Sequence, residues 1–334
     1  MRAVAPGKLI LSGEHAVVYG KPALVLAVDR FAQAIITSNS DPRVHFELID
    51  LHESSSVSVE ALQELKARLL RDYQLFLNGE LNIRQVLVQP FHLFAFLFIS
   101  FIDSVPLKLD GGIHISLSAD IPIGCGMGSS AATLLALLKG LTGFFKIDFK
   151  SDDYFAQGVE AEKLQHGRPS GVDPYIALHG GFVRFQNREA ERLPVPDVPI
   201  HLVHSGRPSS TTGECVEHVA RHFADAVIWD DFEFVTLEMQ RALLKSDVPE
   251  VQRWVRENNK LLTTIGVVPR RVGDFIHNIE VAGGAAKIAG AGSVRGNAAG
   301  MVTVFAEQKP QALADRFGFE LLNVKGESCG ARIV

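Results

Sequence analysis

Residues 122–132 read Pro-Ile-Gly-Cys-Gly-Met-Gly-Ser-Ser-Ala-Ala, with three glycines at alternate positions followed by two serines. Apolar and polar residues alternate over 113–120, which predicts a strand before this stretch. Alanines and leucines then recur at helical spacing, which predicts a helix whose N-cap falls at the serines. A glycine-rich loop that opens a helix directs backbone N–H groups and the positive end of the helix dipole toward one point, and such a point binds phosphate oxygens. The alternative is an ordinary tight turn.

The composition is that of a globular protein long enough for two domains. The chain has 334 residues, of which 47% are hydrophobic and 21% charged. A net charge of −5 gives no support to nucleic-acid binding, which usually needs a basic face. Three scattered cysteines predict a reducing compartment without disulfide bonds. No secretory signal is visible, so we expect a cytoplasmic protein.

Residues 91–102 are rich in Phe, Leu and Ile and resemble a membrane span at first sight. The apolar run is well short of the roughly 20 residues that cross a bilayer. We therefore predict a buried helix, or an apolar patch at a subunit contact, rather than a membrane anchor.

Strands and helices are mixed in both halves of the chain. A proline-rich, charged stretch over residues 187–199 is the best linker candidate, which predicts domains at 1–186 and 187–334. Residues 287–300 form a second glycine-rich segment, predicted to be a loop. In the second half, helical periodicity covers about 213–226, 232–244, 248–264 and 270–281.

The common nucleotide and metal motifs are missing. The sequence has no G-x-x-x-x-G-K-[ST], and the glycines at 124, 126 and 128 do not match the dinucleotide pattern G-x-G-x-x-G. No Cys/His spacing indicates zinc, and no serine lies in a nucleophile elbow.

The remaining polar groups match the needs of phosphoryl transfer, which requires donors around the phosphates, oxygen ligands for Mg²⁺ and a group that manages the acceptor proton. Ser129 and Ser130 lie at the cradle, Glu162 offers a carboxylate, and Asp173 with Lys8 are candidates for the acceptor side. Each has a plain alternative as a solvated helix residue, a turn residue or a surface lysine. Together beside a phosphate cradle they favour the catalytic interpretation.

Three separated stretches resemble the GHMP kinases. Residues 122–132 are similar to the ATP loop of that superfamily. Residues 5–20 (Ala-Pro-Gly-Lys-Leu-Ile-Leu-Ser-Gly-Glu-His-Ala-Val-Val-Tyr-Gly) resemble its first motif in the mevalonate kinase branch, as does Glu162 with His-Gly-Arg-Pro-Ser-Gly-Val-Asp at 166–173. The resemblance implies an α+β fold with a ribosomal S5-like N-terminal domain and a ferredoxin-like C-terminal domain, with the active site in the cleft between them.

The same resemblance implies the roles of individual residues and the use of ATP with Mg²⁺. Ser130 and Glu162 would bind Mg²⁺, and Asp173 would take the proton of the acceptor hydroxyl, with Lys8 keeping the carboxylate ionised. The triphosphate would be held by the loop residues Pro122, Gly124, Gly126, Met127, Gly128, Ser129 and Ser130. The acceptor would be bound by Glu14, His15, Gly290, Ala291 and Gly292.

The glycine-rich segment at 287–300 corresponds to the third glycine-rich motif of the family, and it departs from the family pattern. Ser293, Val294 and Arg295 stand where further glycines are usual. Arg295 would either supply a charge for a carboxylate or phosphate, or be an ordinary solvated arginine. The hydroxyl residues Ser-Ser-Thr-Thr at 209–212 are equally consistent with a ligand-binding cluster and with a helix N-cap.

The implied function is transfer of phosphate from ATP to the 5-hydroxyl of (R)-mevalonate in the mevalonate pathway of isoprenoid biosynthesis. The alternatives are phosphorylation of phosphomevalonate or another small alcohol, decarboxylation of mevalonate diphosphate, and a non-catalytic ligand sensor on the same fold. The expected partner is a small molecule, with no nucleic acid and no membrane, and a homodimer is expected from the family.

Overall fold

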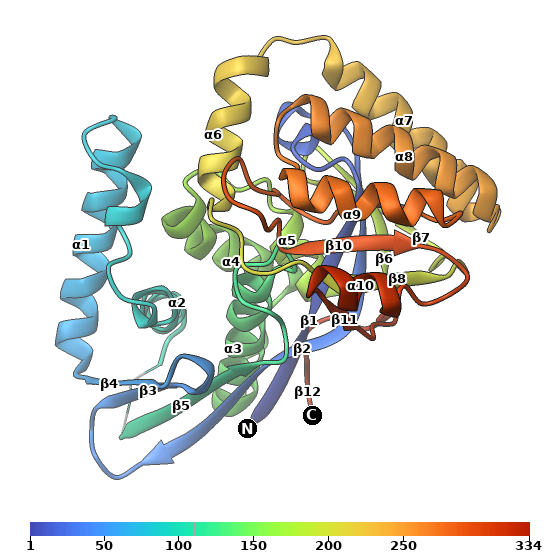
Figure 1. Cartoon of the computed structure of the whole chain (residues 1–334). Helices are drawn as coiled ribbons and strands as arrows, with labels where there is room; N and C mark the ends of the chain where they lie inside the picture. The colour runs from blue at the N-terminus through green and yellow to red at the C-terminus, as the bar shows by residue number, and fades with distance from the viewer. Residues whose placement is uncertain (108, 110) are drawn as a thin grey trace.

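The computed structural model describes residues 1–334 except 108 and 110 and folds them around two β-sheets (Figure 1). The larger sheet has eight strands in the order β12-β1-β2-β5-β3-β4, with β6 added to β2 and β7 added to β6. Every pair of neighbours is antiparallel except β3 and β5. The strands are β1 Arg2–Ser12, β2 Ala23–Asn39, β3 Val44–Leu48, β4 Glu53–Val57, β5 Gly112–Ala119, β6 Phe182–Gln186, β7 Glu189–Leu193 and β12 Arg332–Ile333.

Five α-helices belong to this half, and α3 is the central one. Its Ala/Leu run is apolar on nearly every side, so the helix is buried against β1 and β2. The helices are α1 Val59–Leu77, α2 Phe91–Ser104, α3 Ser129–Phe145, α4 Ser151–His166 and α5 Val172–His179, with short 3-10 turns η1 Ala16–Tyr19, η2 Ile49–Leu51 and η3 Ile83–Gln85.

The smaller sheet is antiparallel, in the order β11-β8-β10-β9. Helices α8 and α9 pack on β9, and α7 packs on α8 and also contacts β1 and β2 of the larger sheet. The elements are β8 Ile200–His204, α6 Thr212–Phe223, α7 Ile228–Leu244, α8 Val248–Thr264, α9 Arg270–Val281, β9 Ala285–Ile288, β10 Met301–Phe305, α10 Gln311–Phe317 and β11 Glu320–Leu322.

The apolar stretch at 91–102 is confirmed as a buried helix. Nine side chains of α2 are buried within the chain, so they do not form an open patch for a second subunit. Over the part of the chain that the structure describes, no helix is long and apolar enough to cross a membrane. The three cysteines are free.

The predicted boundary after residue 186 falls inside a β-hairpin. Strand β7 pairs with β6 from Phe182↔Leu193 to Gln186↔Glu189, so the first half of the predicted linker belongs to the larger sheet. The sequence favours a linker here because β7 is a short edge strand with mostly exposed, charged residues, whose composition resembles that of a loop. The last strand, β12, also returns to the larger sheet and pairs with β1, which brings the two termini close together (Figure 1).

Candidate active site

The glycine-rich stretch forms a loop that leads directly into α3. Gly124, Gly126 and Gly128 have φ values of 73°, 87° and 70°. The N-cap of α3 is Gly128, so the predicted serine cap is wrong, and Ser129 and Ser130 occupy the first helical turn. Among the described residues, none accepts a hydrogen bond from the backbone N–H groups of 124–130. These donors and the α3 dipole therefore remain available for an anion.

Two of these glycines lie close to residues from distant parts of the chain. A Cβ on Gly126 would lie 2.6 Å from the carbonyl oxygen of Ala289. A Cβ on Gly128 would lie 3.1 Å from Cγ of Lys8 and 3.6 Å from Oδ2 of Asp173. The loop thus contacts the third glycine-rich segment on one side and the Lys8–Asp173 pair on the other.

Met127 contributes differently from its neighbours in the loop. Its side chain is 1% exposed and lies in the hydrophobic core. Its carbonyl oxygen accepts a hydrogen bond from the backbone N–H of Lys8 at 2.9 Å. Only the backbone N–H of Met127 is left for a ligand, while its carbonyl ties the loop to β1.

Lys8 and Asp173 form an ion pair at the base of the loop. Lys8 Nζ lies 3.2 Å from Asp173 Oδ1, with the lysine side chain 5% and the aspartate side chain 27% exposed. Lys8 is on β1, and Asp173 is in the first turn of α5. The structure therefore brings together two groups that are 165 positions apart in the sequence.

Glu162 is a buried carboxylate without a hydrogen bond or ion pair to the described residues. It lies on α4 and is 3% exposed. Burial raises its pKa well above the ordinary value, the negative charge of Asp173 adds to this effect, and Lys8 opposes it. A bound cation would stabilise the ionised form of this carboxylate, which burial and Asp173 disfavour.

Ser130 faces the same side of α4. Its Oγ donates to Oε1 of Gln165 at 2.6 Å, and Gln165 is one helical turn after Glu162. No cluster of three or more His, Cys, Asp or Glu side chains suited to a metal occurs in the described part of the chain. A hydroxyl and one carboxylate fit Mg²⁺, which keeps several waters and binds substrate phosphates. Gln165 is a residue that the sequence pattern did not single out.

Glu14 is buried in an ion pair with Lys287, which sequence reasoning missed. The two side chains are 1% and 0% exposed, and Lys287 Nζ also donates to the carbonyls of Ile10 at 3.2 Å and Ile288 at 2.7 Å. Burial raises the pKa of Glu14, and Lys287 opposes this shift. Oε2 of Glu14 has no hydrogen-bond partner among the residues that the structure describes. The signal in the sequence was one charged residue within the apolar run Ala-Ala-Lys-Ile at 285–288.

We expect Lys287→Met to destabilise the protein by about 3–5 kcal/mol, because loss of one partner leaves the other charge buried and uncompensated. The pair joins the two sheets, so urea unfolding followed by circular dichroism should report the loss as one transition. The double variant Glu14→Gln/Lys287→Met should lose less than the sum of the single variants. Strictly additive losses would contradict a direct interaction between the two charges.

His15 connects the first motif to the third glycine-rich segment. It has a left-handed φ of 60°, and its Nε2 lies 3.0 Å from the carbonyl oxygen of Ala291. Burial lowers the pKa of His15 to about 4, so the ring is neutral at neutral pH and Nε2 carries the proton that faces the carbonyl. Nδ1 is buried, and no described residue forms a hydrogen bond with it.

We expect the free energy of unfolding to fall as the pH drops from about 6.5 to about 4, with His15 contributing about 3 kcal/mol of the change. The native state holds this ring neutral, with a pKa of about 4 against an ordinary value of 6.5. Between these two pKa values only the unfolded state binds the proton. The contribution of His15 to the free energy of unfolding is therefore complete above about pH 6.5 and is lost progressively as the pH falls to about 4. Denaturant unfolding across this pH range measures the effect.

His15→Asn is the matched variant, because asparagine adopts a positive φ more readily than most other residues. The difference between wild-type and variant unfolding curves isolates His15 from the other titrating groups. The same pH slope in both proteins would contradict this account.

The third glycine-rich segment begins at the end of β9 and lies against the first loop. A Cβ on Gly290 would lie 3.1 Å from Cα of Gly126. Gly292 is similarly confined, with its Cβ position 2.1 Å from the carbonyl oxygen of Val267. The segment is therefore placed beside both the phosphate cradle and His15.

The residues that replace glycine in this segment are used within the chain. Ser293 is 1% exposed, and its Oγ donates to the carbonyl of Arg295 at 2.6 Å. Arg295 binds the carboxylate of Glu214 at 2.6 Å, and Glu214 also pairs with Arg84. Thr211 is the N-cap of α6, as one of the two sequence interpretations predicts.

Arg207 is a further cation at the outer side of the cradle. It is exposed in the loop after β8, with its Nε 4.0 Å from the Cβ position of Gly124. Burial raises the pKa of the Cys125 thiol, and the charge of Arg207 opposes this shift. Sequence reasoning missed this residue because an isolated arginine in a loop is usually only a solvated side chain.

Comparisons with known proteins agree with the sequence motifs. The N-terminal domain model of the GHMP kinases matches residues 96–181. A mevalonate kinase of Archaeoglobus fulgidus is 31% identical over 301 residues, covering 87% of this chain and 89% of that protein. A mevalonate kinase of Thermococcus onnurineus is 28% identical over 301 residues, covering 87% and 86%. The solved mevalonate kinase of Methanococcus jannaschii superimposes with a TM-score of 0.80 at 22% identity, covering 98% of both chains.

Proposed function

This chain belongs to the GHMP kinase family, and we propose that within it the protein transfers the γ-phosphate of ATP to the 5-hydroxyl of (R)-mevalonate. The product would be 5-phosphomevalonate, an intermediate of isoprenoid biosynthesis. The observation that carries the proposal is the Lys8–Asp173 pair, which packs directly against Gly128 of the phosphate cradle. The relatives named mevalonate kinase, which align over most of the chain, support the choice of acceptor.

The phosphates of ATP would bind the unpaired N–H groups of residues 124–130 at the start of α3, and Arg207 adds positive charge beside Gly124. The acceptor oxygen attacks the γ-phosphorus while the bond to the β–γ bridging oxygen breaks and ADP leaves. Asp173 accepts the proton of the hydroxyl, and Lys8 holds the carboxylate in place. Lys8 and Asp173 are in contact with each other, and both lie beside Gly128 of the cradle.

Ser130 and Glu162 would hold Mg²⁺. When bound, the ion would neutralise phosphate charge. The protein's own contribution is the Ser130 hydroxyl at the start of α3 and the buried Glu162 carboxylate on α4. The hydrogen bond from Ser130 to Gln165 orients the hydroxyl.

The acceptor would lie against Glu14, His15 and the segment 290–292. Glu14 Oε2 and His15 Nδ1 are buried polar atoms without partners, and hydroxyl groups of a ligand would satisfy them. Arg295 pairs with Glu214, so the unusual residues of the third motif give little reason to prefer a different acceptor.

The test is ADP release, coupled to NADH oxidation, with mevalonate, phosphomevalonate, mevalonate diphosphate, galactose and homoserine. We expect kcat/KM to be highest by far with mevalonate, and no carbon dioxide release from mevalonate diphosphate. A higher kcat/KM with another alcohol would reassign the acceptor. Activity with none of them would contradict the kinase proposal.

A further inference from the structure

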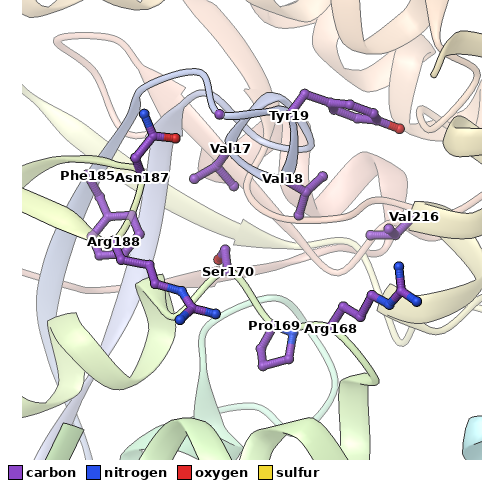
Figure 2. Close-up of a pocket in the computed structure, with 11 residues that line it drawn as sticks. Val17, Val18, Tyr19, Arg168, Pro169, Ser170, Phe185, Asn187, Arg188 and Val216 are labelled. Carbon is purple, nitrogen blue, oxygen red and sulfur yellow. The ribbon is translucent and has the colours of Figure 1, made fainter. Parts of the chain in front are cut away.

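A cavity of about 370 Å³ is lined by residues to which the site described above gives no role (Figure 2). Its wall comprises residues 17–20, which begin two positions after His15, and residues 168–170, which end three positions before Asp173. The β6–β7 turn and Val216 of α6 complete it. The volume falls within the roughly 300–1,000 Å³ of small-molecule sites.

The cavity combines an apolar wall with two cations. Val17, Val18 and Val216 contribute apolar surface. Arg168 and Arg188 lie at its edges, and their guanidinium groups form no hydrogen bond or ion pair with the described residues. In Figure 2 the side chain of Arg188 extends toward Ser170 and Pro169, and that of Arg168 extends toward Val216. None of the described residues that line the cavity is acidic, so its electrostatic character favours an anion.

The two-residue turn requires a positive φ at position 188 but does not explain why the residue there is an arginine. Asn187 and Arg188 are the two residues between the paired ends of β6 and β7, and their φ values are 52° and 66°. A two-residue hairpin of this kind favours asparagine at the first position and glycine at the second. An arginine with a left-handed backbone is strained, which directs attention to what its side chain does.

The hairpin is also fixed to the other side of the cavity. Gln186 Nε2 donates to the carbonyl of Gly20 at 2.9 Å, and the Cβ position of Gly20 lies 3.1 Å from Oδ1 of Asn187. These contacts hold the turn that carries Arg188 beside residues 17–20, which follow Glu14 and His15 in the chain.

We propose that this cavity binds the anionic end of the acceptor, with Arg168 and Arg188 recognising its carboxylate and the valines contacting its apolar carbons. The inference rests on the proposed function and deepens it. It assigns the selection of the substrate class, an alcohol with a carboxylate at the end opposite the reacting hydroxyl, to Arg168 in the 166–173 motif and to Arg188 on the β6–β7 turn.

Arg188→Gly is the sharpest test, because glycine suits the left-handed turn and the variant should melt at the wild-type temperature or above it. We expect the KM for mevalonate to rise by roughly 10-fold or more, as for loss of a hydrogen bond to a charged group, while kcat and the KM for ATP stay near wild type. Arg168→Gln should act in the same direction. Arg316→Gln on α10 is the control and should leave all three constants unchanged.

The role of charge is tested with the triol in which the carboxylate of mevalonate is reduced to a primary alcohol. Wild type should prefer mevalonate strongly, and the double variant Arg168→Gln/Arg188→Gly should lose most of that preference. An unchanged preference or an unchanged KM for mevalonate would overturn the subsite while leaving the kinase proposal intact.

Calorimetric titration of mevalonate without nucleotide separates the subsite from the reaction. Binding to wild type that is weakened roughly 10-fold or more in Arg188→Gly supports the subsite, whatever the turnover. Equal binding to both proteins would overturn it. Absence of turnover in wild type contradicts the proposed function alone.

Discussion

We expect Asp173→Asn to lower kcat with mevalonate by roughly 10²–10⁴-fold, the range attributed to a positioned general base. Asparagine keeps the shape of the side chain but does not accept the proton of the acceptor hydroxyl. The KM for ATP should change little, since the proposed phosphate donors are the N–H groups of residues 124–130 and not the carboxylate. Steady-state kinetics with both substrates varied measures the two effects separately.

The structure supports the view that this variant folds. The Asp173 side chain is 27% exposed, and its ion pair with Lys8 is 3.2 Å long, so the amide oxygen of asparagine is able to accept a hydrogen bond from the same ammonium group. Asp197→Asn is the matched control, because Asp197 is exposed in the segment between the two sheets. Wild-type kcat in Asp173→Asn would contradict the assignment of the base.

The parts of the site that were predictable are those encoded by local sequence. The glycines of the first loop, the carboxylate after a rigid Gly-Arg-Pro-Ser-Gly loop and the lysine of the first strand each stand in a short recognisable pattern. The structure brings Lys8, Asp173 and Gly128 into contact. The exact start of α3 was not predictable, because Gly128 in a left-handed conformation ends the loop one residue before the serines.

The parts that were missed depend on contacts between distant segments. Lys287 pairs with Glu14 across 273 positions, and nothing in the periodicity around either residue identifies the partner. The β6–β7 hairpin was read as a linker because an exposed edge strand carries the same polar residues as a loop. Arg188 is not predictable as a binding residue, because a single surface arginine is usually only solvated and its turn and neighbours are visible only in the structure.

The second large effect concerns the metal. We expect Glu162→Gln to raise the Mg²⁺ concentration that gives half-maximal activity by at least ~10-fold, the lower end of losses seen when metal sites are perturbed. Ser130→Ala should act in the same direction. A titration of Mg²⁺ at fixed total ATP measures both, and Glu160→Gln, at an exposed position two residues away on α4, is the control.

Stability provides an independent readout of the same carboxylate. Glu162 is 3% exposed, and both burial and the charge of Asp173 raise its pKa, so its ionised form is unfavourable in the free protein. Without nucleotide and metal, we therefore expect Glu162→Gln to melt at or above the wild-type temperature. A variant that is as stable as wild type yet needs more Mg²⁺ would identify Glu162 as a group kept for the ion. A wild-type Mg²⁺ requirement would instead remove Glu162 from the metal site, because a buried carboxylate that contributes neither stability nor metal binding has no role in this mechanism.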